Sequence, residues 1–438
     1  MVAAVWGEWH ISQLLDLNLR TLLADGNLPA FTEDRSVALQ IYTRRSDMQQ
    51  FAGSPILDRV RRLATVELLV LPEAILATPI AAHHHAWGVA TKCAAARGSF
   101  VLYLPPDVAW SDGSFRHLAK LIERGLRAIF MTYLRVDGAS FITAIRARDR
   151  GEDSLVLDAR ELVRLGLECL HPLMATSLIG SKHIPLHPEM LFWGVKDEGL
   201  LLRVLAREMF LFDPRRVILN EMQLVGESIP REEVEFVADS DELFAVSLAE
   251  LGKNVELHMR PRTADPVDIG RWWLTYDSPM NDVIAGYDIR WHATAIDEPR
   301  WRRRGFAATL FVRRCAIARE GLRLRAVAHE LGCGIAARVI THAVYTGALA
   351  RAVRGRAPAT VLLPSDAAFG HLPDGSIARL LDADERRELT AFIRAHCLAS
   401  DRDRRPPAEA SGAKGEARNP ARRVGDHTVR VIETCRTW

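Results

Sequence analysis

Lysine is scarce in this chain, and so is net charge. Only six of the 57 basic residues are lysines, and the 55 acidic residues leave a formal net charge of +2 at pH 7. So small an excess gives little long-range attraction for a polyanion, which argues against a dedicated nucleic-acid-binding protein. A GC-rich genome explains the preference for arginine as readily as a function does.

Paired cysteines and long apolar runs are also missing. The six cysteines are scattered without any CxxC spacing, which is typical of buried thiols in a reducing compartment. The longest apolar run, residues 66–82, contains Glu67, Glu73 and two prolines, so it is too polar to span a bilayer. The first residues lack the basic segment of a secretory signal. We therefore expect a soluble, cytoplasmic protein, with peripheral membrane or protein contact left open.

Three motifs of nucleotide and hydrolase chemistry are absent. The sequence contains no GxGxxG, no GxxxxGKS or GxxxxGKT, and no GxSxG. The first two are fingerprints of dinucleotide-binding and P-loop folds, and the third marks the nucleophile turn of many hydrolases. Readings of the chain as a dehydrogenase, a P-loop enzyme or a serine hydrolase therefore have no motif to support them.

What the sequence does have is a regular alternation over its first 140 residues. Short apolar runs alternate with helical patterns, which predicts an α/β fold with a mostly parallel sheet flanked by helices. The expected strands are 2–6, 37–42, 66–71, 100–104 and 127–136, and the expected helices are 11–24, 47–60, 80–97 and 114–125.

The rest of the chain is less regular, and 438 residues are too many for one ordinary core. Residues 302–355 are helical and basic in pattern, residues 401–423 have the composition of a disordered linker, and residues 429–432 form a last strand. We expect a large domain at 1–300, a helical domain at 301–398, a linker at 399–424 and a terminal strand region at 425–438.

Two acidic residues follow the expected fourth strand. Asp107 lies just past the strand end, and Asp112 lies at the entry to the next helix. Ligands of open α/β sheets bind beyond the carboxyl ends of the strands, and two carboxylates there suit Mg²⁺ or Mn²⁺. Asp112 is equally well explained as the helix cap, and Asp107 as a turn residue.

A second acidic group, Asp239, Asp241 and Glu242, follows an expected strand at 234–238. Three carboxylates in four residues repel one another unless a cation or solvent screens them, which favours a metal site or a catalytic base. A solvated turn is the alternative. The run His83–His85 lies in a helix, where successive side chains point about 100° apart, so the three cannot form one metal site. His258 and His292 are interpreted as structural.

Residues 5–8, 22–29 and 41–43 resemble the opening of bacterial glycosyltransferase-like proteins with the A-type nucleotide-diphospho-sugar fold. Residues 102–114, with 127–131, are similar to the central strand, acidic turn and next strand of that fold. The resemblance, which covers roughly residues 1–300, implies a nucleotide sugar bound across the carboxyl ends of the strands and a carbohydrate acceptor beside it.

The same resemblance implies roles for named residues. Asp107 would occupy the place of the family's metal-binding acidic motif, with Asp239 as a further metal ligand and Mn²⁺ or Mg²⁺ against the diphosphate. In the glycosyltransferase hypothesis itself, Asp241 or Glu242 would be the base that removes the proton of the acceptor hydroxyl. The nucleotide would lie beside four residues, which are Trp6, Glu8, Thr43 and Asp112. Asp107 is followed by Val108 and Ala109 instead of the usual Asp-x-Asp, which leaves metal dependence open.

Near the C-terminus, residues 359–369, 372–373 and 389–396 resemble the first conserved box and the central helix of a fasciclin domain. That resemblance implies a small α+β region for adhesion or for protein or carbohydrate contacts. Three hypotheses follow: a glycosyltransferase, a non-catalytic glycan-binding or protein-binding protein, and a metal-dependent hydrolase or nucleotidyltransferase. The run Arg302–Arg304 beside Trp301 would bind anionic lipid or phosphate, or would be a solvated helix face.

Overall fold

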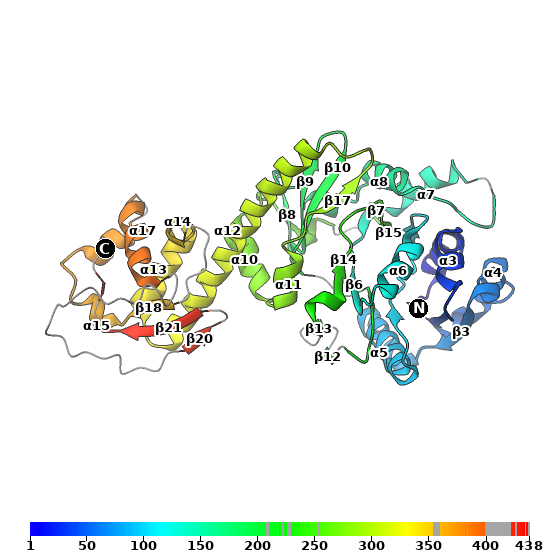
Figure 1. Cartoon of the computed structure of the whole chain (residues 1–438), viewed down its shortest axis with the longest axis horizontal. Helices are drawn as coiled ribbons and strands as arrows, with labels where there is room; N and C mark the ends of the chain where they lie inside the picture. The colour runs from blue at the N-terminus through cyan, green and yellow to red at the C-terminus, as the bar shows by residue number, and fades with distance from the viewer. Residues whose placement is uncertain are drawn as a thin grey trace. The chain divides into compact units, whose positions relative to one another are not determined.

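The structure is a computed structural model, and Figure 1 gives the order of its helices and strands. The described residues are 1–149, 151–206, 210–216, 218–220, 223–225, 229–252, 255–353, 360–382, 384–398, 422–424, 427–433 and 435–436. Most of the expected linker at 399–424 lies outside this set. Its last residues, Arg422–Val424, are described and form strand β20.

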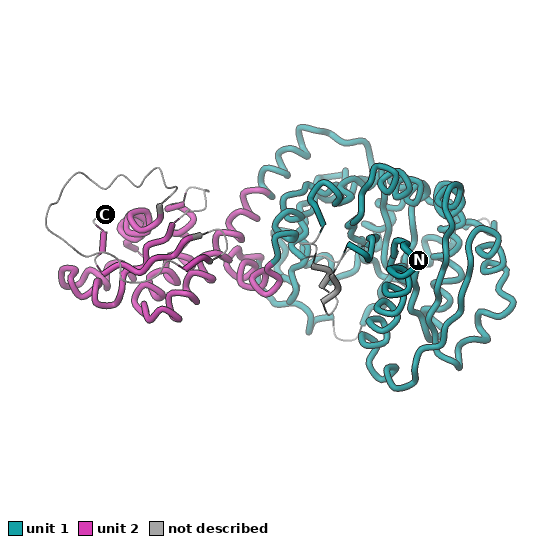
Figure 2. The backbone as a smooth tube through the Cα atoms, turned by 60° about the horizontal axis from the view of Figure 1, so that its bottom comes forward, with its two compact units in different colours: residues 1–263, 278–308 teal, residues 264–277, 309–438 magenta. Residues whose placement is uncertain are grey.

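The chain divides into two compact units, which Figure 2 colours separately. Unit 1 consists of residues 1–263 and 278–308, and unit 2 of residues 264–277 and 309–438. The boundary falls inside the long helix α12 (Glu298–Glu330), and helix α10 (Pro266–Leu274) belongs to unit 2. Among the described helices, none is both long and apolar enough to cross a membrane.

Unit 1 is built on a layer of strands that begins with a parallel sheet. Strands β1 (Val2–Ala4), β2 (Ala38–Thr43) and β3 (Thr65–Val70) pair in parallel, in the order β1-β2-β3. The first three expected strands are therefore confirmed. Their apolar runs are short and separated by helices, which is the pattern that parallel pairing requires.

A second sheet continues this layer, in the order β14-β6-β11-β4. Its strands are β4 (Val101–Leu102), β6 (Ala128–Phe130), β11 (Leu211–Phe212) and β14 (Val234–Phe236). A parallel bridge between Val2 and Tyr103, and a 2.8 Å hydrogen bond from the Leu104 amide to the Val2 carbonyl, put β4 beside β1. The chain thus runs outward from β1 to β2 and β3 and then returns to the other side of β1.

The expectation of a mostly parallel sheet needs correction. Among the described strands, only the sheet β1-β2-β3 is fully parallel. β11 is antiparallel to both of its neighbours, and the sheet β17-β10-β9 is antiparallel throughout. Strands β9 (Met190–Val195) and β10 (Gly199–Val204) are joined by a connection too short for a helical crossover, which forces antiparallel pairing. Unit 1 is therefore a mixed α/β fold with several small sheets.

Apolar residues alternate between the two faces of the strand layer. In β1, Val2 and Ala4 join one core cluster, whereas Ala3 and Val5 join the other. Helix α5 (Pro79–Arg97) buries Ala82, Ala86 and Ala90 in the first cluster. The second cluster takes helical residues from several segments, among them η1 (Leu14–Asn18), α4 (Pro55–Leu63) and α6 (Ser114–Glu123). Helices thus cover both faces, as expected.

A small sheet, β5-β15-β7, lies past the carboxyl ends of β4 and β6 in the chain. It consists of β5 (Val108–Trp110), β15 (Ala245–Ala249) and β7 (Leu134–Asp137). The expected strand at 127–136 is therefore two strands, β6 and β7, in different sheets.

The other elements of unit 1 connect these sheets. The helices are α1 (Glu8–Gln13), α2 (Leu19–Leu22), α3 (Leu28–Thr32), η2 (Arg45–Phe51), η3 (Glu73–Ile75), α7 (Gly138–Arg146), α8 (Ala159–Glu168), α9 (Pro172–Ala175), η5 (Arg231–Glu233), η6 (Val255–His258) and α11 (Pro279–Ile284). The strands are β8 (Ile184–Pro185), β12 (Ile218–Asn220), β13 (Gln223–Val225), β16 (Met259–Arg260) and β17 (Ile289–His292). The expected helix 47–60 is split into η2 and α4, because Gly53 has a φ of 69° and Pro55 starts a new helix.

Unit 2 combines helices with a four-stranded sheet, β19-β18-β21-β20. Its strands are β18 (Thr360–Pro364), β19 (Cys397–Leu398), β20 and β21 (His427–Ile432). Its further helices are α13 (Gly334–Tyr345), α14 (Ala348–Val353), α15 (Asp366–Phe369), α16 (Ser376–Leu380) and α17 (Arg386–His396), of which α13, α14 and α17 are seen beside the sheet in Figure 1. The last expected strand is confirmed as β21.

Trp301 does not belong to a surface basic patch. Its side chain is fully buried, and its indole nitrogen donates a 2.8 Å hydrogen bond to the carboxylate of Glu198. Arg302–Arg304 are exposed on α12, and Trp301 is not part of that exposed surface. The expected pairing of this tryptophan with the arginine run is therefore wrong, because a buried indole needs an internal acceptor and finds one in Glu198.

Candidate functional site

Two groups of side chains stand out at the carboxyl ends of the strands. The first surrounds the ends of β1 and β4. After β1 the chain turns at Gly7, whose φ of 79° favours glycine, and starts α1 at Glu8. The Gly7 amide donates a 2.8 Å hydrogen bond to Asp47, which fixes this turn against the segment that follows β2.

Trp6 is held between two basic side chains at this turn. The Arg44 guanidinium lies 5.8 Å from its ring centroid, and the His83 ring lies at 5.0 Å. His83 also contacts Trp87, which stacks on Tyr103 at 4.6 Å. These contacts tie the end of β1 to α5 and to the residue that follows β4.

Two polar atoms at the end of β2 are left without a protein partner. The Thr43 hydroxyl and the Arg44 Nε are buried, and neither has a hydrogen-bond partner among the described residues. Buried polar atoms usually have a partner, and water or a ligand supplies one when the protein does not. The end of β2 is therefore a place where a polar ligand would gain hydrogen bonds.

Asp107 lies between β4 and β5, and His10 of α1 is among the charged groups near its carboxyl group. Burial raises the pKa of its carboxyl group, and this effect outweighs the opposing effects of His10, Arg135 and a hydrogen bond from Ser247. A carboxylate with a raised pKa that lies among basic groups is suited to take up a proton. We call Trp6, His10, His83 and Asp107 the β1/β4 cluster.

A cavity of about 300 Å³ adjoins Asp107. Arg135 and Ser247, which are cross-strand partners in β7 and β15, line it and also act on the Asp107 carboxyl group. Its other polar lining comes from Tyr133, Ser177, His187, Glu189 and His258. A cavity of this size with several hydrogen-bonding side chains is of the kind that binds small molecules. We call it the Arg135 pocket.

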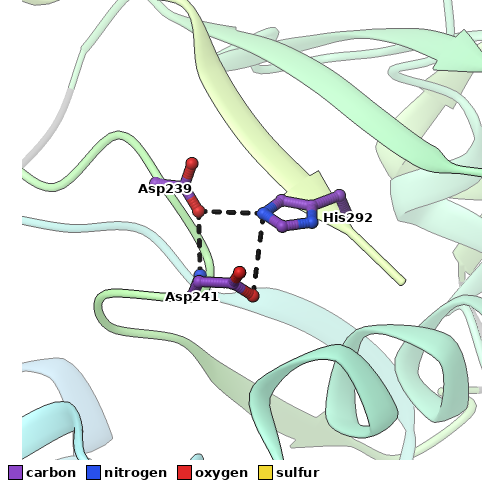
Figure 3. Close-up of side chains that lie close together, drawn as sticks. All are labelled: Asp239, Asp241 and His292. Carbon is purple, nitrogen blue, oxygen red and sulfur yellow. Dashed lines mark hydrogen bonds and ion pairs between the residues drawn. The ribbon is translucent and has the colours of Figure 1, made fainter. Parts of the chain in front are cut away.

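The second group of side chains follows β14 and β17. Figure 3 shows Asp239, Asp241 and His292 pointing toward one another. The His292 Nε2 lies 2.9 Å from the Asp239 Oδ1 and 3.7 Å from the Asp241 Oδ1, and its Nδ1 lies 2.8 Å from the Thr294 carbonyl oxygen. With acceptors at both ring nitrogens, His292 is best satisfied as the doubly protonated cation.

The acid–base balance of this group agrees with an ion pair. Burial alone would lower the pKa of His292, but its bonds to Asp239 and Thr294 raise it. Burial alone would raise the pKa of Asp239, but the bonds from His292 and from the Asp241 amide lower it. Asp241 also accepts a bidentate ion pair from Arg160, at 2.7 Å for the closest contact. Protein cations therefore already balance these carboxylates.

Among the described residues, these three have donor atoms close enough together to hold one metal ion. Their ligand atoms lie within 4.8 Å of one another. A cation bound there would have to displace the proton on His292 Nε2 and compete with Arg160 for Asp241. The mixed nitrogen and oxygen set suits Mn²⁺ better than Mg²⁺, which prefers oxygen alone.

Glu242 lies at the edge of this second group. Burial raises the pKa of its carboxyl group, and the nearby Asp239 and Glu235 raise it further. The nearest basic side chain is His117 of α6, with 3.9 Å between Nε2 and Oε2. Glu242 is thus the acidic side chain of this region whose environment favours the protonated form.

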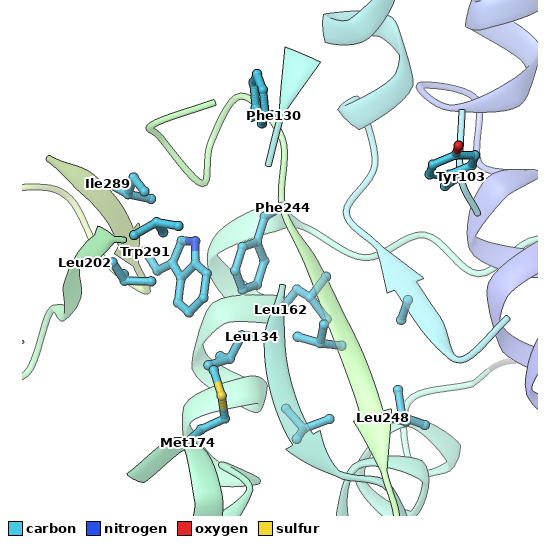
Figure 4. Packing of buried hydrophobic residues seen from close by; sticks show 14 of the residues in the cluster. Tyr103, Phe130, Leu134, Leu162, Met174, Leu202, Phe244, Leu248, Ile289 and Trp291 are labelled. Atoms are coloured by element: carbon cyan, nitrogen blue, oxygen red, sulfur yellow. The ribbon is translucent and has the colours of Figure 1, made fainter. Parts of the chain in front are cut away.

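The structure does not bring Asp107 and Asp239 together. The Asp107 carbonyl accepts from the Leu248 amide at one end of β15, whereas Ser111 donates to Phe244 at the other end. Figure 4 shows Phe244 and Leu248 at opposite ends of this strand. Four residues of strand span about 13 Å. Among the described residues, the group of side chains that could hold a metal ion includes Asp239 but not Asp107, so the two residues assigned to one metal by the sequence are not found in one ligand group.

Asp112 has a structural role that the sequence did not predict. It does not cap α6, since Gly113 is the N-cap and no side chain caps that helix. The Asp112 Oδ1 instead accepts a 2.7 Å hydrogen bond from the Gly26 amide, where a Cβ atom on Gly26 would lie 2.4 Å from the Gly113 nitrogen. Asp112 thus joins two closely packed backbone segments, and the cap interpretation is wrong. Glu8 is exposed in the first turn of α1.

A larger cavity, of about 640 Å³, lies at the opposite edge of the strands. Met1, Val37 and Phe100 line it, and these residues lie at the amino ends of β1, β2 and β4. Ligands of open α/β sheets bind outside the carboxyl ends, at the point where the strand order reverses. That point lies between β1 and β4, so we place the candidate site there and not in the larger cavity.

Four residues of the first site were not found from the sequence: His10, Arg44, Asp47 and Arg135. None belongs to a recognisable motif, and each became visible only through the group that it contacts. One usable signal existed for Arg44 and Asp47, because both follow the end of an expected strand. His292, interpreted as structural, joins the second group because β17 bridges to Asp239.

Comparison with known proteins identifies one region of the chain. No curated protein matches the sequence closely enough to count as a relative. Residues 336–407 match the fasciclin domain family, and they include most of α13 and all of α17 and β18 of unit 2. The resemblance at 359–369 and 389–396 falls inside this range. The chain therefore contains a fasciclin domain at residues 336–407.

Proposed function

We propose that unit 1 transfers a sugar from a nucleotide-sugar donor to a carbohydrate acceptor, at the carboxyl ends of β1 and β4. The observation that carries this proposal is the β1/β4 cluster. It combines an aromatic side chain, two histidines and a carboxylate of raised pKa at the point where the strand order reverses. This is the place where open α/β sheets bind nucleotides.

The surrounding side chains suit both halves of such a substrate. Arg44 and the Thr43 hydroxyl offer unused donors at the end of β2, where a diphosphate would gain charge-assisted hydrogen bonds. The Arg135 pocket, which shares Arg135 and Ser247 with the surroundings of Asp107, offers hydroxyl, imidazole and carboxylate groups to a sugar. Glu8 and Trp6 would border the nucleotide.

The proposed reaction exchanges one bond for another at the anomeric carbon. The bond from that carbon to the diphosphate oxygen breaks, a bond to an acceptor hydroxyl oxygen forms, and the nucleoside diphosphate leaves. The hydroxyl proton passes to the Asp107 carboxylate, whose raised pKa suits it to take up a proton. Glu242 also has a raised pKa, but its neighbours are Asp239, Glu235 and His117 at the second group. Arg44 and His10 would offset the charge on the leaving diphosphate.

A divalent metal is part of the test and not of the proposed step. Asp107 is a single carboxylate with His10 and Arg135 near it, so it is a poor ligand set for a cation. Asp239, Asp241 and His292 would hold Mn²⁺ if the protein uses one, and its charge would stabilise anionic groups nearby. Donor binding is therefore measured with and without Mn²⁺ and Mg²⁺.

The test begins with melting temperatures of the full chain in the presence of nucleoside diphosphates and nucleotide sugars. A ligand that binds only the folded state raises the melting temperature. The donor that does so is then used to measure release of nucleoside diphosphate. We expect D107N to keep the shift but lose turnover by about 10²–10⁴-fold. R44Q is expected to lose most of the shift.

The matched control is D34N, which changes an aspartate that lines the larger cavity at the amino edge. It should leave both the shift and the turnover unchanged. The proposal is wrong if D107N retains full turnover, or if D34N abolishes binding and D107N and R44Q do not. E242Q should keep turnover, because Glu242 lies at the second group. Loss of turnover in E242Q and not in D107N would make Glu242 the base instead.

A second function, binding without catalysis, is favoured by the fasciclin domain. Such domains mediate adhesion and contacts with proteins or carbohydrates, and the match covers residues 336–407. The ion pairs that already satisfy Asp239 and Asp241 agree with a unit 1 that binds without reacting. If no nucleotide changes the melting temperature, this reading replaces the first, and glycans are the next ligands to measure.

A further inference from the structure

Helix α12 exposes a face that none of the contacts described above uses. It is one continuous helix of 33 residues (Figure 1), so the positions of its side chains around the axis follow from helix geometry alone. No acidic residue occurs between Glu298 and Glu320, whereas seven arginines do. One side of this stretch is buried through Trp301, Ala308, Val312 and Cys315. The opposite side is the one that the helix presents to solvent.

Two large apolar side chains lie on the solvent side. Phe306 is 67% exposed and Leu310 is 45% exposed. They are four residues apart, so they are neighbours on one stripe of the helix. Single exposed apolar residues are ordinary on a protein surface, whereas contiguous ones are typical of an interaction surface.

Arginines flank this apolar stripe on both sides. Successive residues are about 100° apart around a helix. Arg302 and Arg313 therefore lie on one side of the stripe, and Arg303 lies on the other. All three side chains are exposed. We call the surface formed by these three arginines, Phe306 and Leu310 the α12 face.

A carboxylate balances part of the charge at the start of the α12 face. The Arg302 guanidinium lies 3.7 Å from Glu298, which also pairs with Arg290 at 2.9 Å. Glu298 is the last acidic residue before the long arginine-rich stretch. Even when its charge is set against that of Arg302, the other two arginines of the face keep their positive charges.

These two arginines have no acidic partner among the described residues. The Arg303 Nε donates to the uncharged Pro299 carbonyl, and Arg313 makes no ion pair or side-chain hydrogen bond there. Arg314 is not counted, because it lines a cavity together with the Asp265 carboxylate. The α12 face therefore carries a net positive charge on both sides of its apolar stripe.

We propose that the α12 face binds the surface of a membrane that contains anionic lipids. Phe306 and Leu310 enter the boundary between the headgroups and the acyl chains, and the arginine stems lie beside them so that the guanidinium groups reach the lipid phosphates. The order of groups on the face matches a bilayer surface, where apolar chains lie beneath a layer of phosphates. A free phosphate would satisfy the arginines but leave both apolar side chains in water. The inference does not depend on glycosyl transfer in unit 1.

The test is co-sedimentation of the full chain with vesicles of phosphatidylglycerol and phosphatidylcholine in equal parts, and with vesicles of phosphatidylcholine alone. We expect binding to the anionic vesicles that weakens at high salt, and at least about tenfold weaker binding to the neutral vesicles. Inorganic phosphate, added at constant ionic strength, should not displace the protein from the anionic vesicles.

Variants separate the apolar contribution from the charge. F306A and L310A should each weaken binding by about tenfold, because each removes apolar area that the membrane buries. R303Q and R313Q should each weaken binding by about fivefold at low salt and by less at high salt. All four changes replace exposed side chains, so the melting temperature of each variant should equal that of the unmodified protein.

R338Q and I80A are the matched controls, because Arg338 of α13 and Ile80 of α5 are exposed and do not belong to the α12 face. Both should bind the anionic vesicles as the unmodified protein does. The proposal is overturned if the anionic vesicles do not bind the protein, if the neutral vesicles bind it equally well, or if the variants of the α12 face bind like the controls. D107N should leave vesicle binding unchanged, so this proposal and the one for unit 1 fail separately.

Discussion

Single residues at the two acidic sites differ in what balances their charge. Burial is the main influence on Asp107. It raises the pKa of the carboxyl group, which favours the protonated form. The hydrogen bond from His292 lowers the pKa of Asp239, which favours the ionised carboxylate. The sequence showed the carboxylates at both places but not these partners, because Asp239 and His292 are 53 residues apart. The two aspartates therefore lie in different electrostatic environments, which shift their pKa values in opposite directions.

The Asp239–His292 pair predicts a pH-dependent stability. The raised pKa of His292 adds stability that is complete below its unfolded value of about 6.5 and is lost as pH rises through the folded value. The lowered pKa of Asp239 adds stability above about pH 4, which is lost in acid. D239N should therefore destabilise unit 1 by about 1–3 kcal/mol near pH 6 and by clearly less near pH 9.

Urea denaturation at the two pH values measures this difference. The control is D58N, which removes the exposed ion pair between Asp58 and Arg61. Exposed pairs contribute about 0.2–1 kcal/mol, so D58N should have a small effect at both pH values. An equal loss of stability for D239N near pH 6 and near pH 9 would mean that His292 is not charged in the folded protein.

Helices and strands were predicted best where the apolar pattern was regular. The strands β1, β2 and β3 and the helix α5 were predicted from the sequence. Short apolar runs between turns favour strands, and a long alanine-rich run favours a helix. The run 127–136 was taken as one strand, although Met131–Tyr133 separates β6 from β7. Periodicity cannot show that a strand leaves one sheet for another, since both halves are buried.

Helix α10 packs closely against α12 at Gly270. A Cβ atom at Gly270 would lie 2.6 Å from the Cys315 carbonyl oxygen and 2.9 Å from the Arg319 amide nitrogen of α12. Backbone atoms cannot move aside as a flexible side chain can, so G270A should lower the melting temperature of unit 2, at a cost of about 1–3 kcal/mol. Scanning calorimetry of the full chain measures it.

The control for this change is G88A. Gly88 lies within α5, and a Cβ atom there would meet nothing within 4 Å. Alanine is a better helix former than glycine by about 1 kcal/mol, so G88A should be neutral or stabilising. If G270A were as well tolerated as G88A, the close approach of α10 to α12 would be in error.

The whole molecule depends on pairings between distant parts of the chain. In unit 2, β21 lies between β18 and β20, and it pairs in parallel with β18. The segment that matches the fasciclin family ends at residue 407, so residues beyond the match complete the sheet. The Arg436 amide also donates to His396 at 3.1 Å. The short fasciclin-like region expected from the sequence is therefore extended by the C-terminal strand.

Removal of residues 422–438 should therefore unfold unit 2. The truncated sheet would keep only β18 and β19, and an isolated pair of strands is marginally stable at best. We expect calorimetry to show the loss of one unfolding transition while the transition of unit 1 remains. Removal of residues 437–438 alone should leave both transitions. Retention of both transitions after the longer truncation would show that β21 is not part of the core of unit 2.

The sequence by itself determined the local properties of this protein. Apolar spacing set the β1–β3 strands and α5, and strand ends marked where Asp107 and Asp239 would lie. Tertiary structure alone decided that His292 pairs with Asp239 and that β11 runs antiparallel between β4 and β6. The physical reason is that spacing along a chain fixes which face a side chain takes, whereas its partners come from segments brought together only by packing.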